Sequence, residues 1–294
     1  MAQTEHRTSE TKKFLKNFFC LMFPFLFLFA HIQSVIMSGS DEKFGEYIDF
    51  SVKKRFGIIT LNRLDRSNAF TINQLRNLKK AVEFCQTSEK VRGIILTANG
   101  TSFSTGMDLD FIDGSNHTAV KELEGTAAEI CVSLFNGKPV IAAINGRCMG
   151  EGVVFLLCCD YRIAVKESYF FMPEILSGIF PGTGCIVLMT RLIGISWTKK
   201  MLMFAEKISS EKALEIGLID ELVDSREQLL DKALEKATFS FTKNQTVLNA
   251  IKLCSNHLLD KSYREAYEIE KEASAWFEHS DKELFLSNFR KKFL

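Results

Sequence analysis

The sequence lacks the residue spacings that mark metal centres, redox pairs and histidine-dependent triads. Its eight cysteines form no C-x-x-C pair, and most lie in apolar stretches, where a free thiol packs as a small hydrophobic side chain. Its five histidines are scattered without the H-E-x-x-H spacing, and none lies beside a convincing nucleophile. We therefore predict no metal site and a reducing compartment, either the cytoplasm or an organelle matrix.

An excess of charge of either sign is also missing. The net charge is +1 and 25% of the residues are charged, which argues against a nucleic-acid-binding surface and against a disordered charged tail. With 294 residues, the chain is long enough for one large domain, or for a domain with a smaller appendage. The composition is that of an ordinary globular protein, and we expect no nucleic-acid partner.

The N-terminal region departs from this pattern. Three lysines precede the uncharged, apolar run Phe18–Ala30, which resembles a signal peptide or a short anchor. Continued to Ile36, the run is about long enough to cross a bilayer. Alternatively, residues 1–36 lie outside the folded domain, because Met37 opens a polar stretch typical of a soluble N-terminus. A membrane contact is expected only if residues 18–36 are retained as an anchor.

The pattern of apolar residues predicts an α/β fold that repeats a β-β-α unit. Tyr47–Arg63 alternates as two short strands around a basic turn, and Thr71–Cys85 has an apolar helical face with Thr71 as a plausible cap. Val91–Ala98 is continuously apolar, as expected of a strand buried on both faces. A second round follows, with a helix within Ala119–Phe135, the strand KPVIAAIN, a helix from about Glu151 and the strand YRIAV.

The pattern becomes helical after Gly194. Ile208–Asp220 carries a serine at a cap position and a glycine as a stop signal. We predict three segments: a hydrophobic N-terminal segment over 1–36, the spiral core over 37–224, and a helical region over 225–294 that covers the core or builds an oligomer.

Two glycine-bearing turns lead directly into predicted helices. In Ser102–Ile112, Gly106 permits a tight turn, and Asp108 and Asp110 suit the first helical turn. The other turn is INGRCMGEGVVFLL, after a buried strand. Free N–H groups at such helix starts stabilise developing negative charge on an oxygen, so two converging turns would form an oxyanion hole. Each turn alone is more often purely structural.

A third stretch, Tyr169–Gly184, places Glu174 after a strand and Pro173, among aromatic and aliphatic residues. Desolvation there would raise the pKa of the carboxyl and make it a usable base near neutral pH. The alternative is a glutamate at the exposed start of a helix. From the residues alone, both remain open.

Taken together, these stretches resemble the enoyl-CoA hydratase/isomerase (crotonase) superfamily. The resemblance runs from about Tyr47 to the end of the chain and rests on STGMDL from Ser104, NGRCMGEG from Asn145, CDYRIA from Cys159 and FMPEILSGIFPG from Phe171. It implies a crotonase-like spiral of β-β-α turns with a C-terminal helical region involved in trimerisation. It also implies an acyl-CoA thioester as the substrate, no further cofactor, and a homotrimer or a dimer of trimers.

The same resemblance assigns the groups that hold the thioester oxygen. They are the backbone N–H groups of Met107 and Glu151, and Glu151 stands where relatives usually carry glycine. A carboxylate at a helix start has a lowered pKa and is a poor base, and one that pointed inward would repel the enolate. We therefore predict that the Glu151 carboxylate faces away, with a direct catalytic role as the alternative.

One departure from the family pattern bears on the reaction. Hydratases of the family usually carry a second glutamate at the position of Val154, and a lone Glu174 is poorly equipped both to activate water and to manage the proton at C2. We therefore predict an isomerase that converts a 3-enoyl-CoA to a 2-enoyl-CoA through a dienolate. The alternatives are a hydratase that uses Glu174 with Glu151, an acyl-CoA hydrolase, and a non-catalytic acyl-CoA-binding homologue. Gly182, where the hydrolases carry aspartate, weakens the hydrolase alternative.

The resemblance also predicts the residues that contact coenzyme A. They are Arg66, Asn68, Ala69 and Phe70 in one loop, Gly106, Asp108, Leu109 and Gly150 at the two turns, and Lys291 or Lys292 near the phosphates. For these lysines a solvated helix end is the commoner fate.

Overall fold

The computed structural model describes residues 42–113 and 117–294. The hydrophobic segment 1–36 lies outside the described residues. Within those residues, no helix combines the length and the hydropathy that crossing a bilayer requires.

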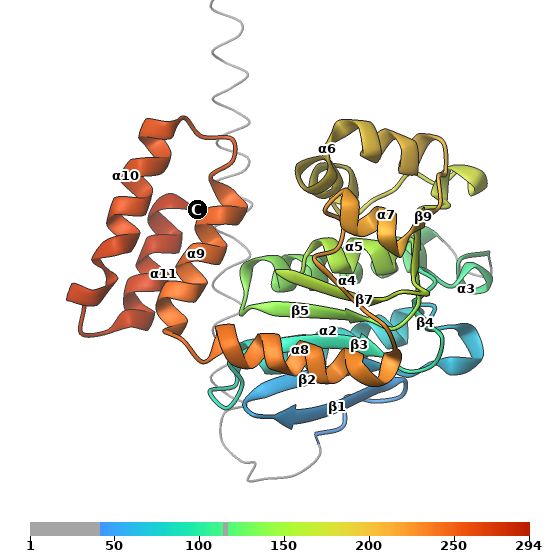
Figure 1. The fold of residues 1–294 in the computed structure, drawn as a ribbon, viewed down its shortest axis with the longest axis horizontal. Helices are drawn as coiled ribbons and strands as arrows, with labels where there is room; N and C mark the ends of the chain where they lie inside the picture. The colour runs from blue at the N-terminus through green and yellow to red at the C-terminus, as the bar shows by residue number, and fades with distance from the viewer. Residues whose placement is uncertain (1–41, 114–116) are drawn as a thin grey trace, which may run out of the picture. The chain divides into compact units, whose positions relative to one another are not determined.

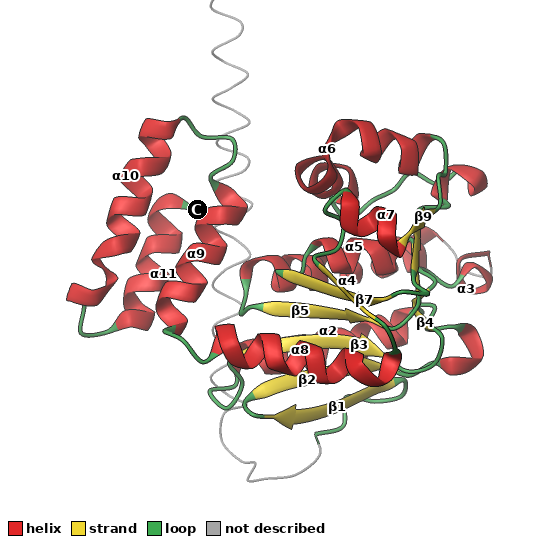
Figure 2. Ribbon diagram, in the orientation of Figure 1, coloured by secondary structure: helices red, strands yellow, loops and turns green. Residues whose placement is uncertain are grey.

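Two sheets organise the chain (Figure 2). The larger sheet runs in the order β1 (Ile48–Lys53), β2 (Phe56–Leu61), β3 (Gly93–Ala98), β5 (Val140–Ile144), β7 (Tyr161–Val165) and β10 (Glu221–Val223). All neighbours in it are parallel except β1 and β2. The smaller sheet runs in the order β4 (Ser102–Ser104), β6 (Arg147–Met149), β8 (Tyr169–Phe171) and β9 (Ile208–Ser209).

Successive turns of the chain place one strand in each sheet and then add helix. The helices after β4 are α3 (Leu109–Asp113) and α4 (His117–Asn136), α5 (Glu151–Leu157) follows β6, and η2 (Glu174–Ser177) and α6 (Cys185–Met203) follow β8. This arrangement confirms the predicted α/β fold of repeated β-β-α turns. The second strands of these turns have only three residues each, too few for their alternation to be recognised in the sequence.

Strand β3, within the larger sheet, is buried on both faces, as the apolar run Val91–Ala98 predicts (Figure 1). Because side chains alternate along a strand, Ile94 and Leu96 face a core with α2 (Ile72–Thr87), α4 and α5, whereas Ile95 packs against α8 (Arg226–Phe241). The helical region predicted from residue 225 therefore begins with a helix that covers the core.

The last helices form a cluster of their own, α9 (Gln245–His257), α10 (Tyr263–Ser274), η3 (Ala275–Glu278) and α11 (Lys282–Phe293). Asn244, Ser262 and Asp281 cap the three α-helices, and Ser262 forms a capping box with Glu265. Further upstream, α7 (Ser210–Glu215) starts at the predicted serine cap, Ser209.

Candidate functional site

The two glycine turns meet at the ends of β4 and β6. The main chain of Gly106 has φ +88°, and that of Gly150 has φ +51°. A Cβ atom on Gly106 would lie 3.2 Å from the Met149 carbonyl oxygen and 3.3 Å from the Glu151 nitrogen. Glycine therefore allows both the conformation and the close approach.

The backbone N–H groups of Met107 and Glu151 are free at this meeting point. Their neighbours are bonded, since the Asp108 N–H donates to the Phe70 carbonyl at 2.9 Å and the Gly150 N–H donates to the Phe171 carbonyl at 3.0 Å. Neither Met107 nor Glu151 has an acceptor for its N–H among residues 42–113 and 117–294. Two unpaired donors from adjacent turns are suited to binding one oxygen that carries negative charge.

Phe70 holds the first turn from inside the protein. Its N–H donates to the Gly106 carbonyl at 2.8 Å, and its fully buried ring packs against Phe155 of α5 with centroids 5.2 Å apart. Its buried neighbour Ala69 offers its carbonyl to the Arg63 guanidinium at 2.8 Å. Phe70, through its buried ring, and Ala69, through its carbonyl, thus support the site from within.

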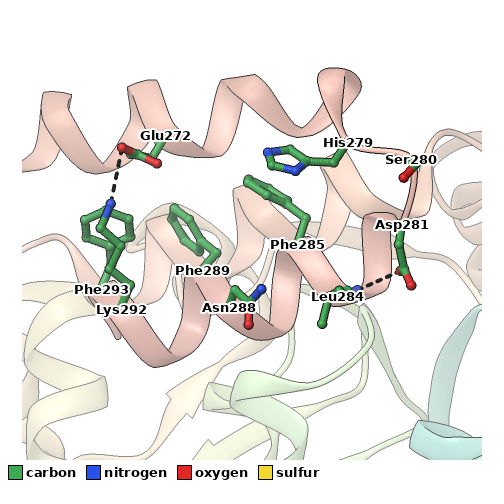
Figure 3. A pocket seen from close by; sticks show the side chains of 10 residues that line it. All are labelled: Glu272, His279, Ser280, Asp281, Leu284, Phe285, Asn288, Phe289, Lys292 and Phe293. Atoms are coloured by element: carbon green, nitrogen blue, oxygen red, sulfur yellow. Dashed lines mark hydrogen bonds and ion pairs between the residues drawn. The ribbon is translucent and has the colours of Figure 1, made fainter.

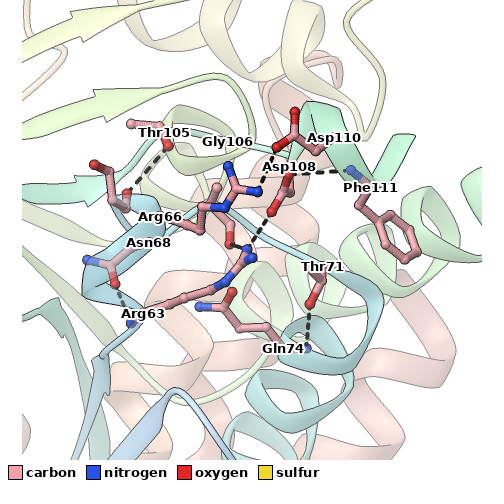
Figure 4. Close-up of polar contacts among 12 residues, drawn as sticks. Arg63, Arg66, Asn68, Thr71, Gln74, Thr105, Gly106, Asp108, Asp110 and Phe111 are labelled. Atoms are coloured by element: carbon pink, nitrogen blue, oxygen red, sulfur yellow. Dashed lines mark hydrogen bonds and ion pairs between the residues drawn. The ribbon is translucent and has the colours of Figure 1, made fainter. Parts of the chain in front are cut away.

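Asn68 and Arg63 connect this loop to the same turn (Figure 4). The buried Asn68 amide accepts from the Arg63 N–H at 2.7 Å and donates to the Ser102 carbonyl at 2.8 Å. The Arg63 guanidinium lies 2.7 Å from the Asp108 carboxylate. Burial alone would raise the pKa of Asp108, but the hydrogen bond and charge of Arg63 hold it below its usual range. Sequence reasoning missed Arg63, because one basic residue after a strand carries no pattern.

Two of the residues predicted for coenzyme A binding, Arg66 and Leu109, lie at the surface beside the first turn. Arg66 of η1 (Leu64–Arg66) pairs with the exposed Asp110 at 2.6 Å, and Leu109 is exposed beside them. Figure 4 shows this pair above the partly buried Arg63–Asp108 pair. Arg66 and Leu109 are thus available to a ligand, whereas Asp108 supports the turn.

Glu174 opens η2 directly after β8, beside the second turn. Its Oε1 lies 3.2 Å from the position that a Cβ atom on Gly150 would take, and its Oε2 is buried without a hydrogen-bond partner among the described residues. Burial raises the pKa of this carboxyl, as the sequence predicts. The alternative of an exposed helix start fits only the residues after it, since Leu176 is 70% exposed.

The Glu151 side chain is buried, with 8% of its surface exposed. Its Oε2 accepts from the Thr183 hydroxyl at 3.1 Å, and its Oε1 accepts from the Cys131 thiol at 3.8 Å. Burial raises the pKa of Glu151 to about 7, and the charge of Glu174 adds to the rise. The prediction of a lowered pKa is therefore wrong, because desolvation outweighs the field at the start of a seven-residue helix.

The comparison with protein families decides the assignment. The family model described as enoyl-CoA hydratase/isomerase matches residues 52–290. The chain belongs to this family. The predicted membership of the crotonase superfamily is confirmed.

Similar proteins include several hydratases. The crotonyl-CoA hydratase of Syntrophomonas wolfei is 30% identical over 231 residues, which cover 78% of this chain and 88% of that protein. The 2,3-dehydroadipyl-CoA hydratase of Escherichia coli is 32% identical over 208 residues, which cover 69% of this chain and 78% of that protein. The solved structure of an enoyl-CoA hydratase from Bacillus anthracis aligns with a TM-score of 0.76 at 26% identity, covering 84% of this chain and 97% of that one.

At position 154 this member of the hydratase/isomerase family carries a valine, and therefore no carboxylate. The side chain is buried in the core beneath the site, next to Phe155. Within the described part of the chain, the carboxyls at the second turn are those of Glu174 and Glu151. Among the described residues, no group of three or more His, Cys, Asp and Glu side chains is arranged to hold a metal ion.

The two predicted phosphate-binding lysines lie on α11. Lys292 pairs with Glu272 of α10 at 3.2 Å, and Lys291 is exposed. Lys292 also borders a pocket next to Phe289 and Phe293 (Figure 3). The two lysines predicted to lie near the coenzyme A phosphates therefore belong to the C-terminal helical cluster.

Proposed function

We propose that the chain is an acyl-CoA double-bond isomerase that converts a 3-enoyl-CoA to a 2-enoyl-CoA. One observation carries the proposal: within residues 42–113 and 117–294, the buried Glu174 Oε2 has no hydrogen-bond partner, and it lies beside a turn that presents a free N–H. A buried polar atom without a partner is costly to stability, which is typical of a group that acts on a ligand.

The arrangement suits a proton shift by one base. Glu174 would remove a proton from C2 of the 3-enoyl thioester, and its raised pKa brings the carboxylate closer to the basicity that the step needs. The electrons of the broken C–H bond would pass to the thioester oxygen, where the N–H groups of Met107 and Glu151 stabilise the dienolate. Protonation at C4 by the same Glu174 would then leave the double bond between C2 and C3.

The contacts of Glu151 favour this assignment. Both of its carboxyl oxygens already accept hydrogen bonds, from Thr183 and from Cys131. A second base at this position would have to share its oxygens with those two donors while it activated water. We therefore assign the reaction to Glu174 and the backbone, with Glu151 contributing its N–H.

A second candidate is an enoyl-CoA hydratase that uses both carboxyls. It is favoured by the pKa of Glu151, raised to about 7 by burial and by the nearby charge of Glu174, since a group that titrates near neutral pH can exchange a proton. The names of the relatives from S. wolfei and E. coli point in the same direction. In this case Glu151 would supply the carboxyl that Val154 lacks.

We propose the ligand and its contact residues from the resemblance to the family. The coenzyme A thioester is itself the substrate, and we expect no further cofactor. Arg66 and Leu109 are placed to contact it at the surface, and Lys291 or Lys292 is proposed to approach its phosphates. We further propose a homotrimer or a dimer of trimers.

The test gives the purified full chain 3-hexenoyl-CoA and crotonyl-CoA in parallel. The isomerase converts the first ester to the conjugated 2-enoyl ester without hydrating the second. Glu174→Gln should lower kcat by about 10²- to 10⁴-fold, the range expected for loss of general acid–base catalysis. The matched control is Glu167→Gln, an exposed glutamate, which should leave kcat unchanged.

Two results would contradict the isomerase. Rapid hydration of crotonyl-CoA that is lost in both Glu174→Gln and Glu151→Gln would identify the hydratase. Binding of both esters without turnover would identify the non-catalytic homologue.

A further inference from the structure

The segment 178–184 between η2 and α6 is loosely packed. A Cβ atom added to Gly178, Gly182 or Gly184 would meet no atom within 4 Å. Phe180 is 76% exposed. Burial therefore contributes little to holding this segment, although it directly follows Glu174.

Most hydrogen bonds of the segment are local. The Ile179 N–H donates to the Glu174 carbonyl at 2.9 Å, and the Cys185 N–H donates to the Gly182 carbonyl at 3.1 Å. Within the part of the chain that the structure describes, the bond from the Thr183 hydroxyl to Glu151 is the one that connects 178–184 to the rest of the core.

Thr183 has an unfavourable main-chain conformation. Its φ is +54°, which a β-branched residue rarely adopts. Such a conformation persists only where surrounding contacts hold it. The bond from Thr183 to the Glu151 carboxyl, at 3.1 Å, is the contact available for this purpose.

The Glu151 carboxyl, which accepts that bond, is itself held in place by its surroundings. It is buried in the first turn of α5, and its other oxygen accepts from Cys131 of α4 at 3.8 Å. The carboxyl therefore joins two packed helices to one loosely packed segment. Because the Ile179 N–H is bonded to the Glu174 carbonyl, a displacement of the segment would be transmitted to the main chain of Glu174.

We propose that Glu151 and Thr183 are positioning residues, whose hydrogen bond holds segment 178–184 and thereby orients the Glu174 carboxyl at the two turns. This inference rests on the proposed function for the role of Glu174 as the base. The holding of the segment itself does not depend on the reaction.

The experiment compares Thr183→Val, Thr183→Ser and the control Ser177→Ala, an exposed residue of η2, in the full chain. Valine keeps the shape of threonine and removes the hydroxyl. Amide hydrogen exchange over 178–188 should become about tenfold faster in Thr183→Val, as expected of a local opening, while exchange in β3 and β5 stays unchanged. Thr183→Ser and Ser177→Ala should exchange like the parent protein.

Activity provides the second measurement. With 3-hexenoyl-CoA, Thr183→Val should lower kcat by about tenfold with KM within about twofold, because misorientation affects the base rather than binding. Thr183→Ser should restore kcat. Glu151→Ala should accelerate exchange over 178–188 at least to the same extent, because it removes the same bond together with the contact to Cys131. Adding Thr183→Val to Glu151→Ala should accelerate exchange over 178–188 no further, since the bond between the two residues is already lost.

Two outcomes would overturn the inference. Unchanged exchange over 178–188 in Thr183→Val would show that the bond does not hold the segment. Faster exchange with an unaltered kcat would show that the segment does not orient Glu174. A parent protein that turns over no enoyl-CoA would contradict the proposed function instead, and the exchange measurement would still decide whether the bond holds the segment.

Discussion

The surroundings of each glutamate side chain at the site determine the pKa of its carboxyl. Glu174 and Glu151 both occupy the first position of a helical turn, where the helix end favours a charged carboxylate. Burial acts in the opposite direction and prevails in both, so the pKa of each is raised. The two differ in their hydrogen bonds: both Glu151 oxygens accept one, whereas the Glu174 Oε2 has no partner in the part of the chain that the structure describes.

The raised pKa of Glu151 predicts how stability depends on pH. The folded-state value is about 7 against an ordinary 4.5, so the fold favours the protonated acid. The contribution of protonated Glu151 to the free energy of unfolding is complete below about pH 4.5 and is lost as the pH rises through about 7. At pH 8, Glu151→Gln should therefore raise the free energy of unfolding by ~2 kcal/mol relative to the parent protein, because the neutral amide avoids a buried charge.

Denaturant unfolding at pH 8 and pH 5 measures this effect. The gain should fade at pH 5, where the parent residue is already neutral in the folded state. An equal difference at both pH values would mean that the carboxyl is not buried as described. Glu167→Gln, at an exposed site, is the control and should change stability at neither pH.

At the scale of elements, periodicity was informative where the elements are long. The β1–β2 hairpin, β3 and α2 with its Thr71 cap lie where the sequence predicts them. The change of pattern at Gly194 proves to be a kink inside α6, where Gly194 has φ +75°, and not the start of a new layer. One glycine with a positive φ interrupts the apolar pattern as a helix boundary would.

The packing of α8 on the larger sheet can be tested at Phe241, the last residue of the helix. The Phe241 ring packs edge-on against Phe56 with centroids 5.6 Å apart, and a Cβ atom on Gly93 would lie 2.2 Å from the Phe241 ring. Phe241→Ala should lower the free energy of unfolding by about 3 kcal/mol, because it leaves a cavity under α8. The exposed Phe239 on the same helix is the control, and Phe239→Ala should cost less than about 0.5 kcal/mol.

A double-variant cycle sharpens this test. Gly93→Ala alone should also destabilise the protein, because the added methyl overlaps the Phe241 ring. In the Phe241→Ala background the same change fills part of the vacated space and should cost much less. Additive effects in urea unfolding would contradict the packing of α8 on β3.

At the scale of the whole molecule, one buried lysine joins the C-terminal helices to the spiral. Lys252 of α9 donates to the carbonyls of Leu134 and Lys138 at 2.6 Å and 3.2 Å, and lies 2.7 Å from the Asp160 carboxylate. Its side chain is buried. These bonds connect α9 to the end of α4 and to the turn between α5 and β7.

Removing that ammonium tests the connection. Lys252→Met keeps the apolar stem but leaves its three acceptors without their donor, so the free energy of unfolding should fall by about 2 to 3 kcal/mol. Amide exchange in α9 should accelerate at the same time. The exposed Lys261, just after α9, is the control. A loss below about 0.5 kcal/mol in thermal unfolding would show that the apolar contacts of α9 suffice.

The sequence by itself determined the α/β fold of repeated β-β-α turns and the caps at Thr71 and Ser209, because these depend on neighbours along the chain, through alternation, helical period and capping. Its motifs also carried the resemblance to the family, whereas for Glu174 they left a desolvated carboxyl and an exposed helix start both open. Only the tertiary structure decided what surrounds Glu151, how Arg63 supports the turn at Asp108, and where Lys252 docks. The residues in these contacts lie 32, 45 and 118 positions apart for Glu151 with Thr183, Arg63 with Asp108 and Lys252 with Leu134. Desolvation and hydrogen bonding act between groups that meet only after folding, so no local pattern encodes them.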